Sequence, residues 1–149
     1  MSQLRVEAEG ITSADPEAVW SLVADANAYP SWGPWNDGGY QPAAEGPSRK
    51  GSIQWFRYGR HTTVEEILEV DEPRRLVYTV LRGMPVRNYR AEVTLTPAAP
   101  KGTSVRWTAT WDGTFMGRMV HRRLQQIYRQ VMTALIAAAD HKDALDRQK

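Results

Sequence analysis

Five β-rich runs follow one another between residues 53 and 111, and this succession restricts the fold more than any other feature. The runs cover residues 53–58, 62–70, 75–81, 87–96 and 104–111. Short segments that contain Gly or Pro separate them, as is typical of hairpin connections. Because no helical pattern interrupts the runs, the sequence predicts an antiparallel meander and argues against a parallel sheet with helical crossovers.

The segment before the meander predicts one more strand and two short helices. Residues 4–9 alternate between apolar and polar side chains, which is the pattern of a half-buried strand. Asp15 suits the N-cap of a helix and Pro16 suits its first position. Residues 27–29 are expected to add a second short helix that breaks near Pro30. The Gly-, Pro- and Trp-rich residues 31–51 allow at most one irregular strand, around residues 35–41.

A long amphipathic helix is predicted for residues 117–145. Its apolar stripe consists of Val120, Leu124, Ile127, Val131, Leu135 and Ala138. The concave face of the sheet is the only surface large enough to cover this stripe. Since 149 residues suit one hydrophobic core, we expect a single α+β domain over residues 1–149.

Several local segments resemble the START/Bet v 1-like superfamily, also called SRPBCC. The similarity rests on residues 14–25 (ADPEAVWSLVAD), 29–32 (YPSW), 72–78 (EPRRLVY) and 113–118 (GTFMGR). It extends over essentially the whole chain and is closest to the polyketide cyclase/dehydrase and lipid-transport branch. The resemblance implies a helix-grip fold, in which a curved antiparallel sheet of about six or seven strands wraps around the long C-terminal helix, with two short helices after the first strand.

The resemblance also implies a hydrophobic cavity between the sheet and the C-terminal helix. Members of the family bind lipids, hormones, quinones or polyketides there, and a minority catalyse cyclisation or dehydration. A twisted sheet cannot stay in full contact with a straight helix, so a pocket between them is physically reasonable. Because the matching segments are turns rather than catalytic residues, the resemblance implies the fold and leaves the function open.

Strand alternation predicts which side chains face this cavity, and the predicted lining is rich in Trp and Tyr. These residue types offer a broad apolar surface with one polar group each. The chain has 6 Trp and only 2 Phe, so we expect a flat, aromatic or fused-ring ligand. Together with the helix residues that point at the sheet, the expected ligand-binding residues are Trp55, Arg57, Glu66, Leu68, Tyr89, Ala91, Trp107, Trp111, Val120, Leu124 and Ile127.

Arg57 and Glu66 are the charged members of this predicted lining. Both occupy an otherwise apolar strand face, in strands joined by a short turn, so they are expected to face each other inside. A buried charge must be paired or its pKa shifts, and such groups often mark functional sites. Two other readings stay open: a structural ion pair near the rim, or a one-residue register slip that places both side chains in solvent.

Basic residues gather in the first turns of the predicted long helix, at Arg118, His121, Arg122 and Arg123. Cations there oppose the helix dipole, so another interaction must hold them. Pairing with nearby carboxylates, an anionic ligand group at the pocket mouth and an acidic partner surface are the three explanations, with pairing favoured. A net charge of +2 without a dense basic tract gives no support for nucleic-acid binding.

Several functional classes lack the residues they need. The chain has no Cys, its 3 His have no metal-ligand spacing, and no Ser lies in a nucleophile elbow. Its glycines form no phosphate-binding fingerprint, so we expect neither metal nor cofactor. No apolar run approaches the length of a membrane span and the N-terminus does not resemble a signal peptide. We therefore expect a cytoplasmic protein without stable membrane insertion, as a monomer or homodimer.

The leading interpretation is binding or transport of a small hydrophobic ligand that is aromatic, polyketide or lipid-like. The first alternative is an enzyme of the polyketide aromatase/cyclase type, in which Arg57, Glu66 and a tyrosine such as Tyr78 or Tyr89 transfer protons. The second alternative is a protein-interaction module with a vestigial cavity. Polar groups that converge inside the cavity favour the enzyme, a uniformly apolar cavity favours carriage, and a collapsed cavity favours the interaction module.

Overall fold

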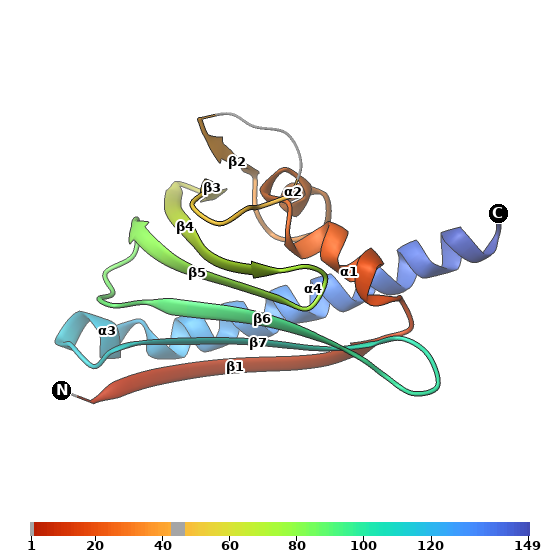
Figure 1. Ribbon diagram of the computed structural model, residues 1–149. Helices are drawn as coiled ribbons and strands as arrows, with labels where there is room; N and C mark the ends of the chain where they lie inside the picture. Colours follow the sequence, from red (N-terminus) through yellow and green to blue (C-terminus); the bar gives the residue numbers. More distant parts are fainter. Residues whose placement is uncertain (1, 43–46) are drawn as a thin grey trace.

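A seven-stranded antiparallel sheet curves around one long helix in the computed structural model, which describes residues 2–42 and 47–149 (Figure 1). The strand order is β1-β7-β6-β5-β4-β3-β2. The strands are β1 (Gln3–Thr12), β2 (Asp37–Gln41), β3 (Ile53–Tyr58), β4 (His61–Asp71), β5 (Arg75–Arg82), β6 (Arg90–Pro97) and β7 (Thr103–Asp112). The predicted meander is therefore confirmed, and β1 joins it by pairing with β7.

The helices lie at the two ends of the meander. After β1 come α1 (Pro16–Val23), the 3₁₀ helix η1 (Ala26–Ala28) and α2 (Tyr29–Trp32); after β7 come α3 (Phe115–Met119) and α4 (His121–Arg147). Asp15 occupies the N-cap of α1, although its side chain makes no capping hydrogen bond. The helix-grip fold implied by the sequence is thus confirmed. In the described part of the chain, no helix is long and apolar enough to cross a membrane.

The predicted C-terminal helix is divided at Val120. This residue ends α3 and begins α4, with backbone angles of φ −89° and ψ −6°. Thr114 caps α3 by accepting a hydrogen bond from the Gly117 amide at 3.0 Å, and Trp111 Nε1 donates to the Gly117 carbonyl at 2.9 Å. These bonds fix α3 against β7 as a separate turn, an arrangement that helical periodicity alone cannot show.

The core lies between α4 and the concave face of the sheet. The stripe on α4 buries Leu124, Val131 and Leu135, and Leu135 has no exposed surface. Gly10 lets β1 come close to the helix, because a Cβ at this position would lie 2.7 Å from Ile136 Cγ1. The sheet and the helix are therefore in close contact along β1.

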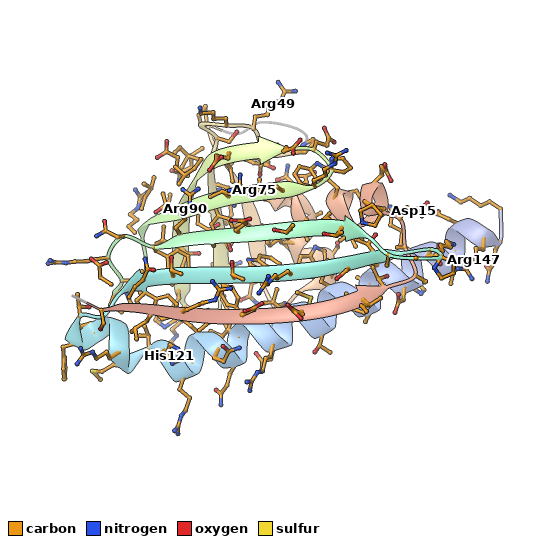
Figure 2. The ribbon with its side chains drawn as sticks, turned by 60° about the horizontal axis from the view of Figure 1, so that its bottom comes forward. Asp15, Arg49, Arg75, Arg90, His121 and Arg147 are labelled. Atoms are coloured by element: carbon orange, nitrogen blue, oxygen red, sulfur yellow. The ribbon has the colours of Figure 1, made fainter. Side chains whose placement is uncertain are left out.

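Side chains of α4 also bond the free backbone edge of β1. Gln125 donates from Nε2 to the Glu7 carbonyl at 2.9 Å, and its Oε1 accepts from the Glu7 amide at 3.3 Å. His121 Nε2 lies 2.9 Å from the Arg5 carbonyl oxygen, and Figure 2 shows His121 on the helix beside this strand. An edge strand normally presents unpaired backbone groups, and here α4 satisfies some of them.

The convex face of the sheet carries a network of ion pairs instead of a core. Arg75 bonds Glu92 at 2.9 Å and Glu69 at 3.0 Å, and Arg90 bonds Glu69 at 2.5 Å. Figure 2 shows Arg75 and Arg90 on neighbouring strands of this face. The hydrogen bond from Arg75 lowers the pKa of the Glu69 carboxyl below its ordinary value. These exposed pairs mark the solvent side of β4, β5 and β6.

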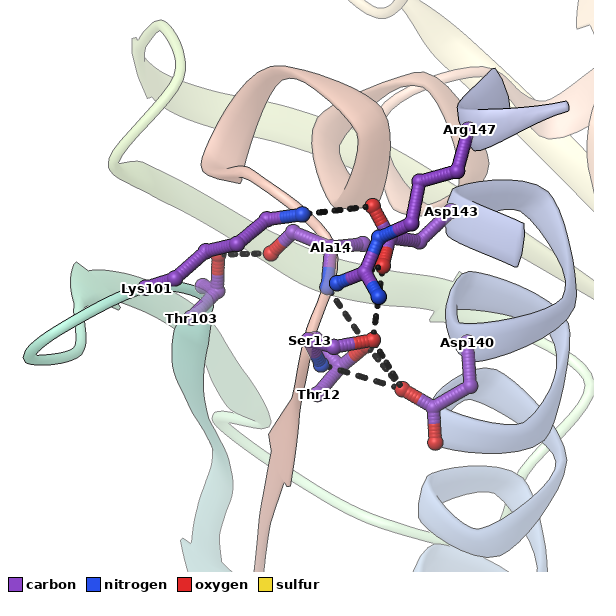
Figure 3. A network of polar contacts seen from close by, with 8 residues as sticks. All are labelled: Thr12, Ser13, Ala14, Lys101, Thr103, Asp140, Asp143 and Arg147. Carbon is purple, nitrogen blue, oxygen red and sulfur yellow. Dashed lines mark hydrogen bonds and ion pairs between the residues drawn. The ribbon is translucent and has the colours of Figure 1, made fainter. Parts of the chain in front are cut away.

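Two aspartates near the C-terminus of α4 fix it to the junction between β1 and α1 (Figure 3). Thr12 Oγ1 and the Ser13 amide donate to Asp140 Oδ1 at 2.6 and 3.1 Å. Ser13 Oγ donates to Asp143 Oδ2 at 2.9 Å, and this bond lowers the pKa of Asp143. The C-terminal half of α4 is therefore fixed where β1 ends.

Replacing Asp140 tests this attachment. Asp140→Ala removes the acceptor for Thr12 and Ser13, and each lost hydrogen bond is worth about 1 kcal/mol. We expect the melting temperature to fall by roughly 2–4 °C for each kcal/mol lost. Asp146→Ala is the matched control, since the carboxyl of Asp146 pairs, among the described residues, with Lys149 alone, at 3.8 Å. Equal melting temperatures for the two variants, measured by circular dichroism, would contradict the attachment.

Candidate functional site

A cavity of about 290 Å³ lies between the concave face of the sheet and the N-terminal half of α4. Strands β1 and β7 run along α4, whereas β2, β3 and β4 rise away from it (Figure 1). The sheet contributes Phe56, Tyr78 and Trp107 to the wall, and the loop after β5 contributes Met84. The helix side of the wall consists of Val120, Arg123, Leu124, Ile127, Tyr128 and Val131.

Aromatic side chains with paired polar groups form much of this wall. Trp107 Nε1 donates to the Tyr78 hydroxyl at 3.0 Å, and the hydroxyls of Tyr89 and Tyr128 are hydrogen-bonded to each other. The Trp107 and Tyr128 rings meet edge to face with their centroids 6.1 Å apart. Burial raises the pKa of all three phenols well above 10, so they stay neutral and act as hydrogen-bonding groups.

Glu65 is the one carboxyl in the wall of this cavity, as far as the described residues show. It lies on β4 with 9% of its surface exposed, and its Oε1 accepts a hydrogen bond from Gln54 Nε2 at 2.9 Å. Within the described segments no cation pairs with it. Burial raises its pKa to about 8, against a smaller opposite effect of the Gln54 bond. Glu65 is therefore mainly protonated and uncharged at neutral pH.

A row of buried polar groups holds Gln54 in place behind Glu65. Ser48 Oγ donates to Gln54 Oε1 at 2.8 Å, and the Ser48 and Tyr40 hydroxyls lie 3.3 Å apart. Tyr40 in turn donates to Asp25 Oδ1 at 3.2 Å and accepts from the Ala26 amide at 3.0 Å. Because its carbonyl oxygen is occupied by Ser48, the Gln54 amide presents its nitrogen to Glu65. The row thus connects the cavity to the turn before η1.

The predicted inner faces of β3 and β4 are wrong by one residue. Gln54 and Phe56 point inward, whereas Arg57 is exposed and lies opposite Thr62 in the ladder. Glu66 lies opposite Ile53, so the expected pair of Arg57 with Glu66 does not form. The ladder between β3 and β4 is regular, and on β3 the prediction followed the more apolar alternate residues, Ile53 and Trp55. On β4 the pairing with β5 is irregular between residues 67 and 69, so Val70 packs on the core side together with Ile67, and counting back from Val70 selects Glu66 instead of Glu65. Simple alternation does not hold across such an irregularity.

Some of the other expected lining residues lie in the cavity wall and some do not. Neither Trp55 nor Leu68 lines the cavity; Trp55 instead stands over Gly39, where an added Cβ would lie 3.2 Å from its ring. Ala91 and Trp111 are fully buried in the core and also stay outside the wall. The structure places five of the expected ligand-binding residues in the wall, namely Tyr89, Trp107, Val120, Leu124 and Ile127, together with Tyr78, which was a candidate for proton transfer.

Sequence reasoning missed several residues of the cavity wall, among them Tyr128, Glu65 and Phe56. Tyr128 continues the helical spacing from Leu124 to Val131, so the same periodicity could have found it. Glu65 gave no such signal, because a charged residue that alternates with Thr63 does not indicate the inner face of a strand. Phe56 was missed because Gln54 makes the same face of β3 look polar.

The basic cluster at the start of α4 forms no ion pair within the part of the chain that the structure describes. Among the ion pairs of residues 2–42 and 47–149, none involves Arg118, Arg122 or Arg123. His121 instead contacts the Arg5 carbonyl and packs its ring 5.8 Å from that of Trp111. Pairing with carboxylates, the favoured explanation, therefore finds no support in these residues. Arg123 is exposed at the rim of the cavity.

The raised pKa of Glu65 predicts a pH dependence of stability. The folded chain holds this proton with a pKa of about 8, against 4.5 for an ordinary glutamate. The resulting stabilisation is fully present below about pH 4.5 and is lost as the pH rises towards 8. We expect the free energy of unfolding of the parent, relative to Glu65→Gln, to fall by roughly 3–5 kcal/mol between pH 4.5 and 8.

Urea denaturation at pH 5, 6.5 and 8 measures this difference. Glu66→Gln is the matched control, since this neighbouring acid lies on the other face of β4, and it should follow the parent at each pH. A constant difference between the parent and Glu65→Gln would contradict the buried, protonated state of Glu65.

Comparison with known proteins agrees with this geometry. Residues 3–140 match the family described as polyketide cyclase / dehydrase and lipid transport. No curated protein matches the chain. The fold is similar to a Nitrosospira multiformis protein at 18% identity and a TM-score of 0.76, covering 95% of this chain and 99% of the other.

Two further solved structures show the same fold. A solution structure from Thermobifida fusca is 28% identical over 91% of both chains, with a TM-score of 0.72. The crystal structure of Ara h 8.0201 is 16% identical, with a TM-score of 0.69 over 93% of this chain and 98% of the other. The family match over nearly the whole length shows that the chain belongs to the polyketide cyclase / dehydrase and lipid-transport family.

Proposed function

We propose that the chain binds and carries a compact, flat and mainly apolar small molecule in the cavity beside α4. The observation that carries this proposal is an open cavity of about 290 Å³ with Trp107, Tyr78 and Tyr128 in its wall. Ligand pockets usually measure about 300–1,000 Å³. This one lies at the lower limit, so it suits a molecule of about two or three fused rings better than a lipid with two acyl chains.

The wall favours such a ligand for a second reason. Its large flat rings supply apolar contact area, while their polar atoms bond one another and stay satisfied when water leaves. Leu124, Ile127 and Val131 complete an apolar surface on the helix side. An open cavity of this kind gives no support to an interaction module with a vestigial pocket.

Filling the cavity tests the proposal. Ile127→Trp adds a ring to the helix side of the wall and is expected to weaken binding of 2-ethylnaphthalene at least tenfold from a micromolar dissociation constant. Thr133→Trp, at an exposed position of the same helix, should leave the affinity unchanged. Isothermal titration calorimetry measures both, with melting curves to verify folding. Parent protein that does not bind the probe, or binds it equally after Ile127→Trp, would overturn the proposal.

A second candidate function is an enzyme of the aromatase/cyclase type, and Glu65 is the observation that favours it. A carboxyl with a pKa of about 8 beside the phenols of Tyr78 and Tyr128 is suited to give a proton near neutral pH and take it back. Arg57 and Glu66 have no part in this version, because they lie outside the cavity wall.

Turnover distinguishes the enzyme from the carrier. A poly-β-ketone thioester incubated with the parent protein should lose water or cyclise, a change that mass spectrometry detects. Glu65→Gln should abolish this reaction and Glu66→Gln should preserve it. Bound but unchanged thioester in all three proteins would leave carriage as the function.

A further inference from the structure

The Glu65 carboxyl is a group in the cavity wall that has hydrogen-bonding capacity left for a ligand. We propose that the cavity selects a neutral ligand with a hydrogen-bond acceptor, such as an aryl ketone carbonyl, which accepts a hydrogen bond from the Glu65 carboxyl. This inference rests on the proposed function and names the class of ligand. It also predicts that the apolar part of the ligand lies against Trp107 and Tyr128.

The geometry leaves Glu65 with spare bonding capacity. Its Oε1 accepts from Gln54 Nε2 at 2.9 Å, and this is the one hydrogen bond of the carboxyl among residues 2–42 and 47–149. A protonated carboxyl keeps an O–H donor besides that acceptor. Because Glu65 lies in the cavity wall, a bound ligand that displaces water must supply an acceptor or leave this donor unpaired, which weakens binding.

The phenols of Tyr78, Tyr89 and Tyr128 already have hydrogen-bond partners. The Tyr78 hydroxyl accepts from Trp107, and the Tyr89 and Tyr128 hydroxyls bond each other. Glu65 therefore has more capacity than these three phenols to bond a ligand, because its carboxyl makes one hydrogen bond among residues 2–42 and 47–149.

The charge of the ligand follows from the same surroundings. A cationic ligand would have to lose its own hydration and ionise the buried Glu65, and the desolvation of both charges opposes their attraction. An anionic ligand group would lose its hydration beside a carboxyl that has no cation near it. Arg123 offers positive charge only at the rim, where it is exposed to water. A neutral acceptor such as a carbonyl can bond the protonated Glu65 without ionising it and without burying a charged group.

Several titratable groups act on Glu65 or share its cavity. The phenols that interact electrostatically with it are Tyr29 on α2, Tyr78 on β5, Tyr89 just before β6 and Tyr128 on α4. Burial holds the pKa of each phenol well above 10, so they do not titrate below pH 9.5. Tyr58, His61 and Arg123 also line the cavity, and none of them is changed in the variants used below.

Two probes of equal shape test the proposal: 2-acetylnaphthalene, which carries a carbonyl, and 2-ethylnaphthalene, which does not. The ratio of their dissociation constants, measured by calorimetry, reports the hydrogen bond alone. For the parent we expect the ketone to bind about tenfold more tightly at pH 6.5 and with nearly equal affinity at pH 9.5, where Glu65 has lost its proton.

Three variants identify the donor. Glu65→Gln retains an N–H donor that cannot ionise, so its tenfold preference should persist at both pH values. Glu65→Met has no donor and should show no preference at either pH. Glu66→Gln should behave like the parent. His61 and Arg123 are present in all four proteins, so any effect of their charge would also appear in Glu65→Gln.

The outcomes separate this inference from the proposed function. A parent protein that prefers the ketone equally at both pH values, or a Glu65→Met variant that keeps the preference, would overturn the role of Glu65 while both probes still bind. If neither probe binds the parent, the proposed function itself fails. If Glu65→Met does not fold, the contrast between the parent and Glu65→Gln at pH 9.5 still decides the question.

Discussion

The crossing of a straight helix over a twisted sheet is the constraint on which the rest of the structure depends. Helix α4 stays close to β1 where Gly10 admits Ile136, and its C-terminal half is fixed by Asp140 at the end of that strand. Because adjacent strands are rotated relative to one another, the sheet moves away from the helix toward β3 and β4. The cavity lies in that divergence, so its place follows from the contacts at the opposite side of the fold.

A buried acid without a counter-charge gives this cavity its chemical character. Burying an ionised carboxylate is unfavourable by several kcal/mol unless a cation compensates it, and the described surroundings of Glu65 offer an amide instead. The neutral carboxyl is compatible with an apolar wall, and its orientation depends on Gln54, Ser48 and Tyr40. The position of the Glu65 carboxyl thus depends on a chain of hydrogen bonds that ends at Asp25, which is bonded by Tyr40 on the edge strand β2.

Most of the fold could be predicted from the sequence, because the alternation of strands, the spacing of the helices and the Gly- or Pro-containing turns are regular over most of the chain. On β6 and β7 the alternation holds, and Tyr89, Trp107 and the apolar residues between them point inward as expected. On β4 it breaks between Ile67 and Val70, where the irregular pairing with β5 brings both side chains to the core side. Glu65 and Glu66 are adjacent and chemically identical, so only the three-dimensional register distinguishes the cavity acid from the solvent-facing one. The division of the C-terminal helix at Val120 escaped prediction for a similar reason, because it depends on contacts with Trp111.

The position of β1 has a consequence for how the chain is made. This strand is synthesised first, yet its neighbour in the sheet is β7 and its free edge is bonded by Gln125 and His121. Until the ribosome has released those residues, the strand has neither its partner nor its cover. Unpaired edges and apolar faces exposed during synthesis promote aggregation. Non-native pairing at β1 is therefore a risk during synthesis until β7 and α4 have emerged.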